Sequence, residues 1–419
     1  MPQDTHEEIL CEILAERGVI IERNVELINA VQSSDNVKVT TRNLSTEKEE
    51  TFGVSYLTGC DGAHSFVRRV ADVKMEGGTY GNRFYVADVH VDPSTHLLPL
   101  GSAQMNLSTT EFCMMVPYKA KNKCRLVGYL PAHLIDKSDV KWTDIEPTVS
   151  EVTKFKFKGS AWFSTYNLHH RVASQFRVNR IFLCGDACHL HSPAGGQGMN
   201  AGIGDSTNLA WKLAAVVKGQ ASKEILDTYE PERQDFAKLM VKTTDTVFNF
   251  LVGRNILGWI FRVIVLSYIL PFLTSFAVFR RGLYRSVSQL KIAYPQSALS
   301  VDQFLRSGKG SSNRANAGDR LPWVEGLGIW TEDNYSSMQT STWQIHIYGS
   351  AESEFAHFAR RKGLRVEVFS WYEMTGKAGL VRDLVYLVRP DIHIGWIGRQ
   401  NDEDGLSRYL KYWGIGHVH

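Results

Sequence analysis

One segment, from Arg180 to Leu213, constrains the fold of this chain most strongly, because it joins an apolar strand to a long helix through a glycine-rich loop. Arg180 to Cys184 is an apolar run of strand length, and the Gly-Asp pair that follows it is a turn signal. From about Gly198 the spacing of apolar residues predicts a helix. The predicted buried stripe of this helix consists of Ile203, Leu209, Ala210, Leu213 and Ala214.

This arrangement of strand, loop and helix predicts a ligand site. Three glycines in the loop let the backbone approach a ligand without side-chain interference. The helix N-terminus has free N–H donors and the positive end of the helix dipole, so it stabilises a ligand atom that becomes negative. Asp186 follows the strand end, where its carboxylate can accept hydrogen bonds from a sugar diol. The alternative is a strand, an Asx turn and a helix without a ligand, but the glycines, Pro193 and Asn200 favour the ligand site.

A second motif has the same character. Tyr56 to Ser65 is an apolar strand end followed by Gly59, Asp61 and Gly62, and Arg68 and Arg69 come shortly after it. On its own this motif is weak evidence, since a strand followed by an Asp-Gly turn is common.

Together the two motifs resemble those of the single-component FAD-dependent aromatic hydroxylases of the phenol hydroxylase and polyketide hydroxylase type. GCDGAHSFVRR, at 59–69, is similar to the DG motif of that family, and GDACHLHSPAGGQGMNAGIGDSTNLAWKL, at 185–213, is similar to its GD motif. Further matches lie at 226–233, 317–322 and 387–391, so the resemblance extends over nearly the whole chain.

The resemblance implies a monooxygenase in which FAD is reduced by NAD(P)H, reacts with O₂ and delivers one oxygen to an aromatic substrate. It places Asp186 on the ribityl or ribose hydroxyls, the backbone from Gly196 to Asn200 along the flavin edge, and Pro193 near the reacting carbon. It also places Asp61 and Gly62 near the pyrophosphate. The implied cofactor-binding residues are Asp61, Gly62, Gly185, Asp186, Pro193, Gly196, Gln197, Gly198, Met199 and Asn200.

Two tyrosines are candidates for the substrate pocket. Phenol hydroxylases have an arginine after the proline that ends one substrate strand, whereas here Tyr118 follows Pro117, which puts phenol itself in doubt as the substrate. Tyr129 matches the tyrosine on the next strand of that family. The alternative is that both are ordinary strand tyrosines with solvated hydroxyls.

The sequence contains no G-x-G-x-x-G fingerprint of the kind with which the family opens, and it begins with a predicted helix from Glu7 to Arg17. The expectation is therefore a chain without the first βαβ unit, which holds FAD weakly. Two further interpretations are open: a truncated, inactive homologue that serves as a binding module or does not fold stably, and a flavin oxidase or dehydrogenase on the same scaffold.

The predicted fold class is α/β and α+β, with an incomplete Rossmann-like FAD domain interleaved with a substrate domain of sheet and helices, and a thioredoxin-like domain at the C-terminus. The predicted boundaries are 1–70 for the partial FAD domain, 71–170 for the substrate sheet, 171–234 for the return to the FAD domain, 235–306 for the helical part of the substrate domain, and 320–419 for the thioredoxin-like domain.

Composition excludes some partners. The formal net charge is +3 and there is no long run of like charges, so the sequence lacks the basic patch typical of nucleic-acid-binding proteins. The six cysteines are not spaced as in a disulfide-rich protein, which favours a reducing, cytoplasmic location. Cys184, Cys188, His189 and His191 suggest zinc, but the turn at Gly185 separates the first from the others, so we predict no metal. The sequence is compatible with a homodimer.

One apolar segment raises the question of a membrane. Val263 to Phe279 is uncharged and lies between Arg262 and the pair Arg280 and Arg281, which is compatible with a short anchor. It contains Pro271 and is short for a span. We therefore predict buried helices here and do not expect a membrane partner.

Overall fold

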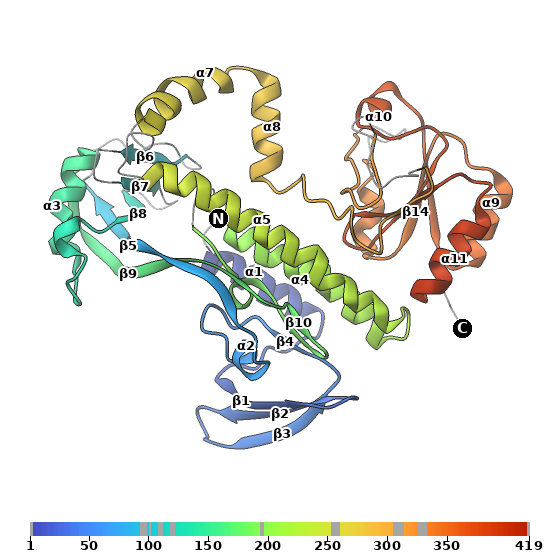
Figure 1. The fold of residues 1–419 in the computed structure, drawn as a ribbon, viewed down its shortest axis with the longest axis horizontal. Coiled ribbons are helices and arrows are strands. Elements are labelled where there is room, and N and C mark those ends of the chain that lie inside the picture. Colours follow the sequence, from blue (N-terminus) through green and yellow to red (C-terminus); the bar gives the residue numbers. More distant parts are fainter. Residues whose placement is uncertain are drawn as a thin grey trace.

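Four β-sheets and a pair of long central helices organise the part of the chain that the computed structural model describes (Figure 1). The described residues are 3–92, 99, 102–107, 112–117, 122–192, 197–252, 260–304, 314–325 and 333–416. Within them the predicted mixture of α/β and α+β architecture is present.

The smallest sheet carries both sequence motifs. Its strand order is β10-β11-β4, with β10 (Arg177–Val178) antiparallel to β11 (Ile181–Leu183) and β11 parallel to β4 (Leu57–Gly59). Because parallel strands end at the same edge of a sheet, the loops that follow β4 and β11 leave side by side. The first loop leads into α2 (Phe66–Val70), and the second leads through the 3₁₀ turn η2 (Gly185–Ala187).

An antiparallel meander forms the lower part of the molecule in Figure 1. After α1 (Gln3–Glu16) the chain runs through β1 (Val25–Gln32), β2 (Val37–Asn43) and β3 (Glu49–Val54). Val37 and Val39 alternate with polar residues along β2 and are buried, as a sheet with one covered face requires.

The largest sheet has the order β12-β9-β5-β8-β7-β6. Its two longest strands pair along most of their length, with an interruption in register between Thr79 and Arg83. One strand, β12, belongs to the GD segment, so the predicted flavin loop continues into this sheet. The strands are β5 (Met75–Val91), β6 (Gln104–Leu107), β7 (Phe112–Pro117), β8 (Lys123–Tyr129), β9 (Phe157–Ala173) and β12 (His189–Leu190), and η1 (Ala132–Leu134) and α3 (Trp142–Thr153) connect β8 to β9.

Two long helices, α4 (Gly198–Val217) and α5 (Tyr229–Val252), cross the middle of the molecule and are joined by η3 (Lys223–Thr228). The apolar stripe predicted for α4 is correct only at Leu209, which is buried, and Leu213, which packs against the core. It is wrong at the other three positions, because Ile203 is 43% exposed, and Ala210 and Ala214 are exposed as well. The face that α4 buries is largely polar, because its charged groups are paired with charges on neighbouring elements. The buried residues of α4 are Ala201, Asp205, Asn208, Leu209 and Lys212.

Helices after α5 arch over the top of the molecule in Figure 1. They are η4 (Phe261–Ile269), a stretch of π-helix, α7 (Leu270–Thr274) and α8 (Ala277–Val287). The burial predicted for this segment is wrong, because none of the described side chains at 263–279 is buried. In the described residues no single helix is long and apolar enough to cross a membrane. One pair, Val263–Thr274 and Ala277–Val287, meets the length and composition criteria jointly and is bent by 111°.

The C-terminal unit contains a five-stranded mixed sheet in the order β13-β17-β16-β14-β15. Strand β14 is parallel to β15 and antiparallel to β16, and all its side chains are buried. The thioredoxin-like assignment stays a prediction. The elements are β13 (Val301–Asp302), η5 (Ser336–Thr340), β14 (Gln344–Tyr348), α9 (Ser353–Arg361), β15 (Arg365–Phe369), α10 (Glu373–Lys377), β16 (Val385–Val388), β17 (Ile394–Gly398) and α11 (Glu403–Trp413).

Candidate functional site

The DG and GD motifs meet at the carboxyl ends of β4 and β11. The ladder between these strands continues past β11, because the N–H of Cys184 donates to the carbonyl of Gly59 at 2.9 Å. Arg68 then joins the two loops: its Nη1 donates to the carbonyl of Ala187 and its Nη2 to that of Ala63, both at 2.9 Å. Because the buried side chain of Arg68 is hydrogen-bonded to both loops, the loops are held next to each other and form one continuous surface.

Gly185 and Asp186 form the turn at the centre of this surface. Gly185 has φ of +60°, a conformation that glycine adopts without the steric penalty of a β-carbon. Asp186 is exposed, and within the described residues its carboxylate has no hydrogen bond or ion pair. A free carboxylate at this edge is available to the hydroxyl groups of a ligand.

Beneath the turn lies a buried carboxylate that is not among the site residues expected from the sequence motifs. Asp205 of α4 is fully buried and accepts from the N–H of Gly185 at 2.9 Å. Its Oδ2 lies 2.7 Å from Nε2 of His189, and its Oδ1 accepts from Nε of Arg233 at 2.7 Å. Burial alone raises the pKa of Asp205, but the hydrogen bond with His189 and the charge of Arg233 outweigh burial and lower it. Asp205 is therefore ionised and fixes the backbone of the turn.

Arg233 extends this network to α5 and beyond. Its Nη2 donates to the carbonyl of Ala201 at 3.1 Å, and its Nη1 donates to the hydroxyl of Tyr294 at 2.9 Å. The guanidinium also lies over the ring of Phe236, 4.4 Å from its centroid. A sequence signal for this network existed: Asp205, Asn208 and Lys212 recur at helical spacing, which places three polar groups on one face.

The first turn of α4 adjoins this network. Its amides have no acceptors inside the helix, as at any helix N-terminus, and Met199 and Asn200 are exposed. Gln197 precedes the helix, and its carbonyl accepts from Ala201. A β-carbon at Gly198 would lie 3.3 Å from Nε2 of His191, so this glycine leaves room for the histidine ring.

Three of the predicted site residues, Tyr118, Pro193 and Gly196, lie outside the described residues.

Asp61 of the DG motif has a structural role. Its carboxylate accepts from the N–H groups of Phe66 and Val67, at 2.6 and 3.0 Å, and from the hydroxyl of Ser65. These bonds cap the N-terminus of α2. Gly62, with φ of +78°, forms the turn next to it. A role of Asp61 and Gly62 near a pyrophosphate stays a prediction.

Tyr129 lies in an aromatic layer between the large sheet and α5. It is 6% exposed, and its ring stacks on Phe112 and meets Phe84 edge on, at centroid distances of 5.8 and 5.9 Å. Phe248 of α5 packs on Phe84 from the other side, at 5.5 Å. The crevice beside Tyr129 measures about 10 Å³, which is too small for a ring. Its role in a substrate site stays a prediction.

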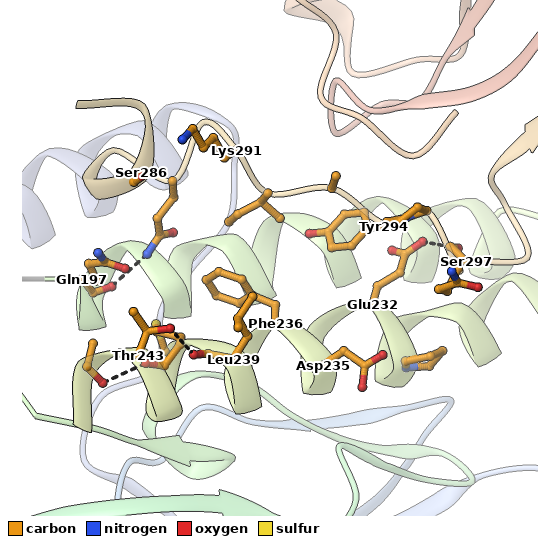
Figure 2. Close-up of a pocket in the computed structure, with 18 residues that line it drawn as sticks. Gln197, Glu232, Asp235, Phe236, Leu239, Thr243, Ser286, Lys291, Tyr294 and Ser297 are labelled. Atoms are coloured by element: carbon orange, nitrogen blue, oxygen red, sulfur yellow. Dashed lines mark hydrogen bonds between the residues drawn. The ribbon is translucent and has the colours of Figure 1, made fainter. Parts of the chain in front are cut away.

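A pocket of about 630 Å³ lies between α5 and the chain at 286–297 (Figure 2). Gln197 stands at one end of it, where its carbonyl accepts from Nε2 of Gln289 at 3.3 Å. Phe236 and Leu239 of α5 supply an apolar floor, and Tyr294 faces them from the opposite wall. This volume is typical of a site for an organic molecule of moderate size. Because Arg233 bonds Tyr294 and stacks on Phe236, the pocket and the turn at Gly185 share one buried network.

Cys188, His189 and Asp205 bring possible metal-ligand atoms within 4.8 Å of one another. Asp205 already pairs with Arg233, and burial raises the pKa of the Cys188 thiol well above its ordinary value. A neutral thiol and an adjacent guanidinium both oppose cation binding. These contacts favour loop support over metal binding.

The chain resembles known proteins over its whole length. A family model described as an FAD binding domain matches residues 1–244. An aromatic compound monooxygenase, described as uncharacterized, from Bacillus subtilis (strain 168) is 28% identical over 98% of this chain and 79% of its own length. A 6-methylpretetramide 4-monooxygenase from Streptomyces rimosus is 34% identical over 63% of this chain and 46% of its own length. Three curated relatives are matched over half of their length or less.

A solved structure agrees with these matches. An anhydrotetracycline hydroxylase from Streptomyces rimosus superimposes with a TM-score of 0.77 and 26% identity, over 100% of this chain and 80% of that one. The matched family model covers 244 of the 419 residues and includes both motifs described above. The chain therefore belongs to the FAD-dependent aromatic hydroxylases, a family of flavoprotein monooxygenases.

Proposed function

We propose that this protein hydroxylates a phenolic or polyketide-like aromatic molecule, with FAD as cofactor and NAD(P)H and O₂ as co-substrates. The observation that carries the proposal is the exposed carboxylate of Asp186 at the end of β11, held in place by the buried Asp205 beneath it. Two of the similar proteins are named for polycyclic substrates, 6-methylpretetramide and anhydrotetracycline, which favours a molecule of several fused rings.

The described residues fit the flavin half of the cofactor. Asp186 would accept hydrogen bonds from its hydroxyl groups, and the first-turn amides of α4 would stabilise negative charge on its ring system. Bound FAD supplies the redox chemistry that activates O₂. Asp205 and Arg233 serve this site indirectly, because they hold the turn at Gly185 and the first turn of α4 in one geometry.

The pocket in Figure 2 is the proposed place of the aromatic substrate. Phe236, Leu239 and Tyr294 offer apolar and aromatic contacts, and the pocket begins at Gln197, next to the first turn of α4. The aromatic layer around Tyr129 and Phe248 would exclude water from the space between the sheet and α5.

The decisive experiment measures flavin binding and product formation by the purified protein. Absorbance between about 350 and 500 nm reports bound FAD. Oxidation of NADH and NADPH is then followed with and without a polycyclic phenol, and mass spectrometry looks for the addition of one oxygen atom. Oxygenated product supports the proposal. Hydrogen peroxide without oxygenated product supports the oxidase alternative, and a colourless protein without activity supports the binding-module alternative.

Asp186→Ala tests the residue that carries the proposal. A charge-assisted hydrogen bond in a shielded site contributes about 1.5–3 kcal/mol, so we expect FAD affinity to fall roughly ten- to a hundredfold. Asp35→Ala is the matched control, because Asp35 is an exposed aspartate in the turn between β1 and β2. Equal FAD affinity of the two variants would contradict the role of Asp186.

A further inference from the structure

The segment from Ile260 to Ser288, here named the apolar arm, exposes an unusual number of large apolar side chains. Neither α7 nor α8 has a buried residue. Phe272 and Phe276 are 65% and 52% exposed and pack edge on against each other, and Val278 is 85% exposed. The other exposed large apolar residues of the arm are Ile260, Val263, Ile264, Tyr268, Ile269, Leu283, Tyr284 and Val287. In Figure 1 the arm arches away from α5. A patch of this kind marks an interaction surface.

The apolar arm lies in a stretch of the sequence whose charged residues are all cationic. From Thr246 to Val301 the sequence contains no aspartate or glutamate. The same stretch contains six cationic residues, Arg254, Arg262, Arg280, Arg281, Arg285 and Lys291. Three of them belong to α8, where they alternate with the exposed apolar residues. The whole protein has a net charge of only +3, so this stretch of the sequence has a local excess of positive charge because it lacks acidic residues.

We propose that the apolar arm binds the anionic lipid surface of a membrane. Apolar side chains beside arginines are the pattern of helices that lie in the interface, with the apolar groups among the acyl chains and the cations at the headgroups. Each arginine near an anionic surface adds to the attraction. The arm is proposed to lie on the membrane and not to cross it, because no single described helix is long and apolar enough to cross and its two helical parts are bent by 111°. The helix α8 alone has 11 residues and rises about 16 Å, roughly half of the hydrocarbon thickness.

The charge pattern also disfavours a second copy of the chain as the occupant. In a two-fold symmetric dimer the same patch meets itself, so the two arms would bring cations against cations without a carboxylate between them. An anionic lipid surface satisfies the apolar side chains and the arginines together.

The test is sedimentation of the purified protein with vesicles of phosphatidylcholine that contain about 30% phosphatidylserine, compared with vesicles of phosphatidylcholine alone. We expect binding to the anionic vesicles, weak binding to the neutral ones, and a decrease in binding as salt is added. The double variant Arg281→Gln and Arg285→Gln should lower the partition coefficient about fivefold for each arginine. Both arginines are exposed, and Arg280 is left in place because it hydrogen-bonds the carbonyls of Thr274 and Ser275.

A second variant pair tests the apolar contribution. Phe272→Ser with Val278→Ser should reduce binding to anionic vesicles at least tenfold, because two exposed apolar groups are lost. The matched controls are Arg360→Gln with Arg361→Gln on α9, and Val217→Ser with Tyr412→Ser, which remove equally exposed groups elsewhere. Both controls should bind vesicles like the unaltered protein.

Three results would overturn the proposal: no binding to anionic vesicles, equal loss of binding in the controls, or a dimer in light scattering that only the Phe272→Ser and Val278→Ser changes dissociate. The last result would assign the arm to a second copy of the chain. Vesicle binding does not depend on FAD or turnover, so it is judged separately from the proposed hydroxylase activity.

Discussion

At the scale of single residues, the buried ion pair between Asp205 and Arg233 connects α4 to α5 at the site. Both side chains are almost fully buried, and Asp205 neutralises Arg233 while it holds the backbone of Gly185. Removal of one partner from a buried pair leaves the other charge without compensation in a medium of low polarity.

We therefore expect Asp205→Asn to lower the free energy of unfolding by about 3–5 kcal/mol, measured by urea denaturation. Asp227→Asn is the control, since the Asp227 side chain is 70% exposed in its ion pair with Arg177, and its loss should cost less than about 1 kcal/mol. Equal effects of the two substitutions would contradict the role given to Asp205.

The two aspartates of the GD segment show what sequence alone can reveal. The position of Asp186 after a strand and before a glycine-rich loop was predictable from its neighbouring residues, whereas its contact with a flavin stays a prediction. Asp205 was missed, because its partner Arg233 lies 28 residues further along the chain and comes near only when α4 packs on α5. Tyr129 was located on the correct strand, but its place in one apolar cluster with Phe84 and with Phe248 of α5 depends on the packing of α5 against the large sheet.

At the scale of secondary-structure elements, the strands were the most predictable part. Phe112–Pro117 and Gln344–Tyr348 are each a run of mainly apolar residues with clear ends, which is the sequence pattern of a strand. Helix α3 was not predicted; it contains Pro147 and several β-branched residues, which lower helix propensity. The apolar stripe of α4 was wrong at Ile203, Ala210 and Ala214, because the pairing of charges with neighbouring elements, which the sequence of one helix does not show, decides which face is buried.

Strand β14 gives a prediction about acid stability. Burial, together with the charge of Arg365, lowers the pKa of His346 to about 3. The folded protein therefore keeps this histidine neutral, while the unfolded chain protonates it below about pH 6.5. The stability that results is present above pH 6.5 and is lost as the pH falls toward 3.

Between pH 7 and 4 the unaltered protein should consequently lose about 3 kcal/mol more stability than the His346→Gln variant, in urea denaturation at each pH. His357→Gln, an exposed histidine on α9, should follow the pH dependence of the unaltered protein. Parallel curves for His346→Gln and the unaltered protein would show that this group does not contribute.

The pocket along α5 offers a test at the same scale. Leu239→Trp places a larger side chain on the pocket floor, so we expect KM for the aromatic substrate to rise at least tenfold while FAD content stays the same. Val217→Trp on α4 is the control, because Val217 is 63% exposed and lies outside the pocket. An unchanged KM in the Leu239 variant would exclude the pocket as the substrate site.

At the scale of the whole molecule, a second buried charge cluster joins the C-terminal unit to the central helices. Glu232 of α5 accepts from Nη1 and Nη2 of Arg389, at 2.7 and 2.9 Å, and from Nζ of Lys212 at 2.8 Å. Asp391 pairs with the same arginine at 2.6 Å. Two cations and two carboxylates thus balance one another between the two parts of the chain.

Glu232→Gln should leave this interface with excess positive charge and uncouple the C-terminal unit. We expect calorimetry to show two unfolding transitions in the variant where the unaltered protein shows one, with a loss of about 3–5 kcal/mol in the less stable part. Glu373→Gln, which removes an exposed partner of Lys377, should keep a single transition. A single, unshifted transition for Glu232→Gln would show that the apolar core alone couples the two parts.

The strand β12 has a mechanical consequence for access to the aromatic layer. Through His189 and Leu190 the loop that bears Asp186 is hydrogen-bonded to β9, and β9 continues through β5 to the strand of Tyr129. The hydrogen bonds between these strands resist separation of the strands within the sheet. The loop and the sheet are therefore expected to move together. Phe248 and the 2.6 Å hydrogen bond from Tyr80 to Asp245 hold α5 against this sheet, so a ligand that entered between the sheet and α5 at Phe248 would have to break these contacts.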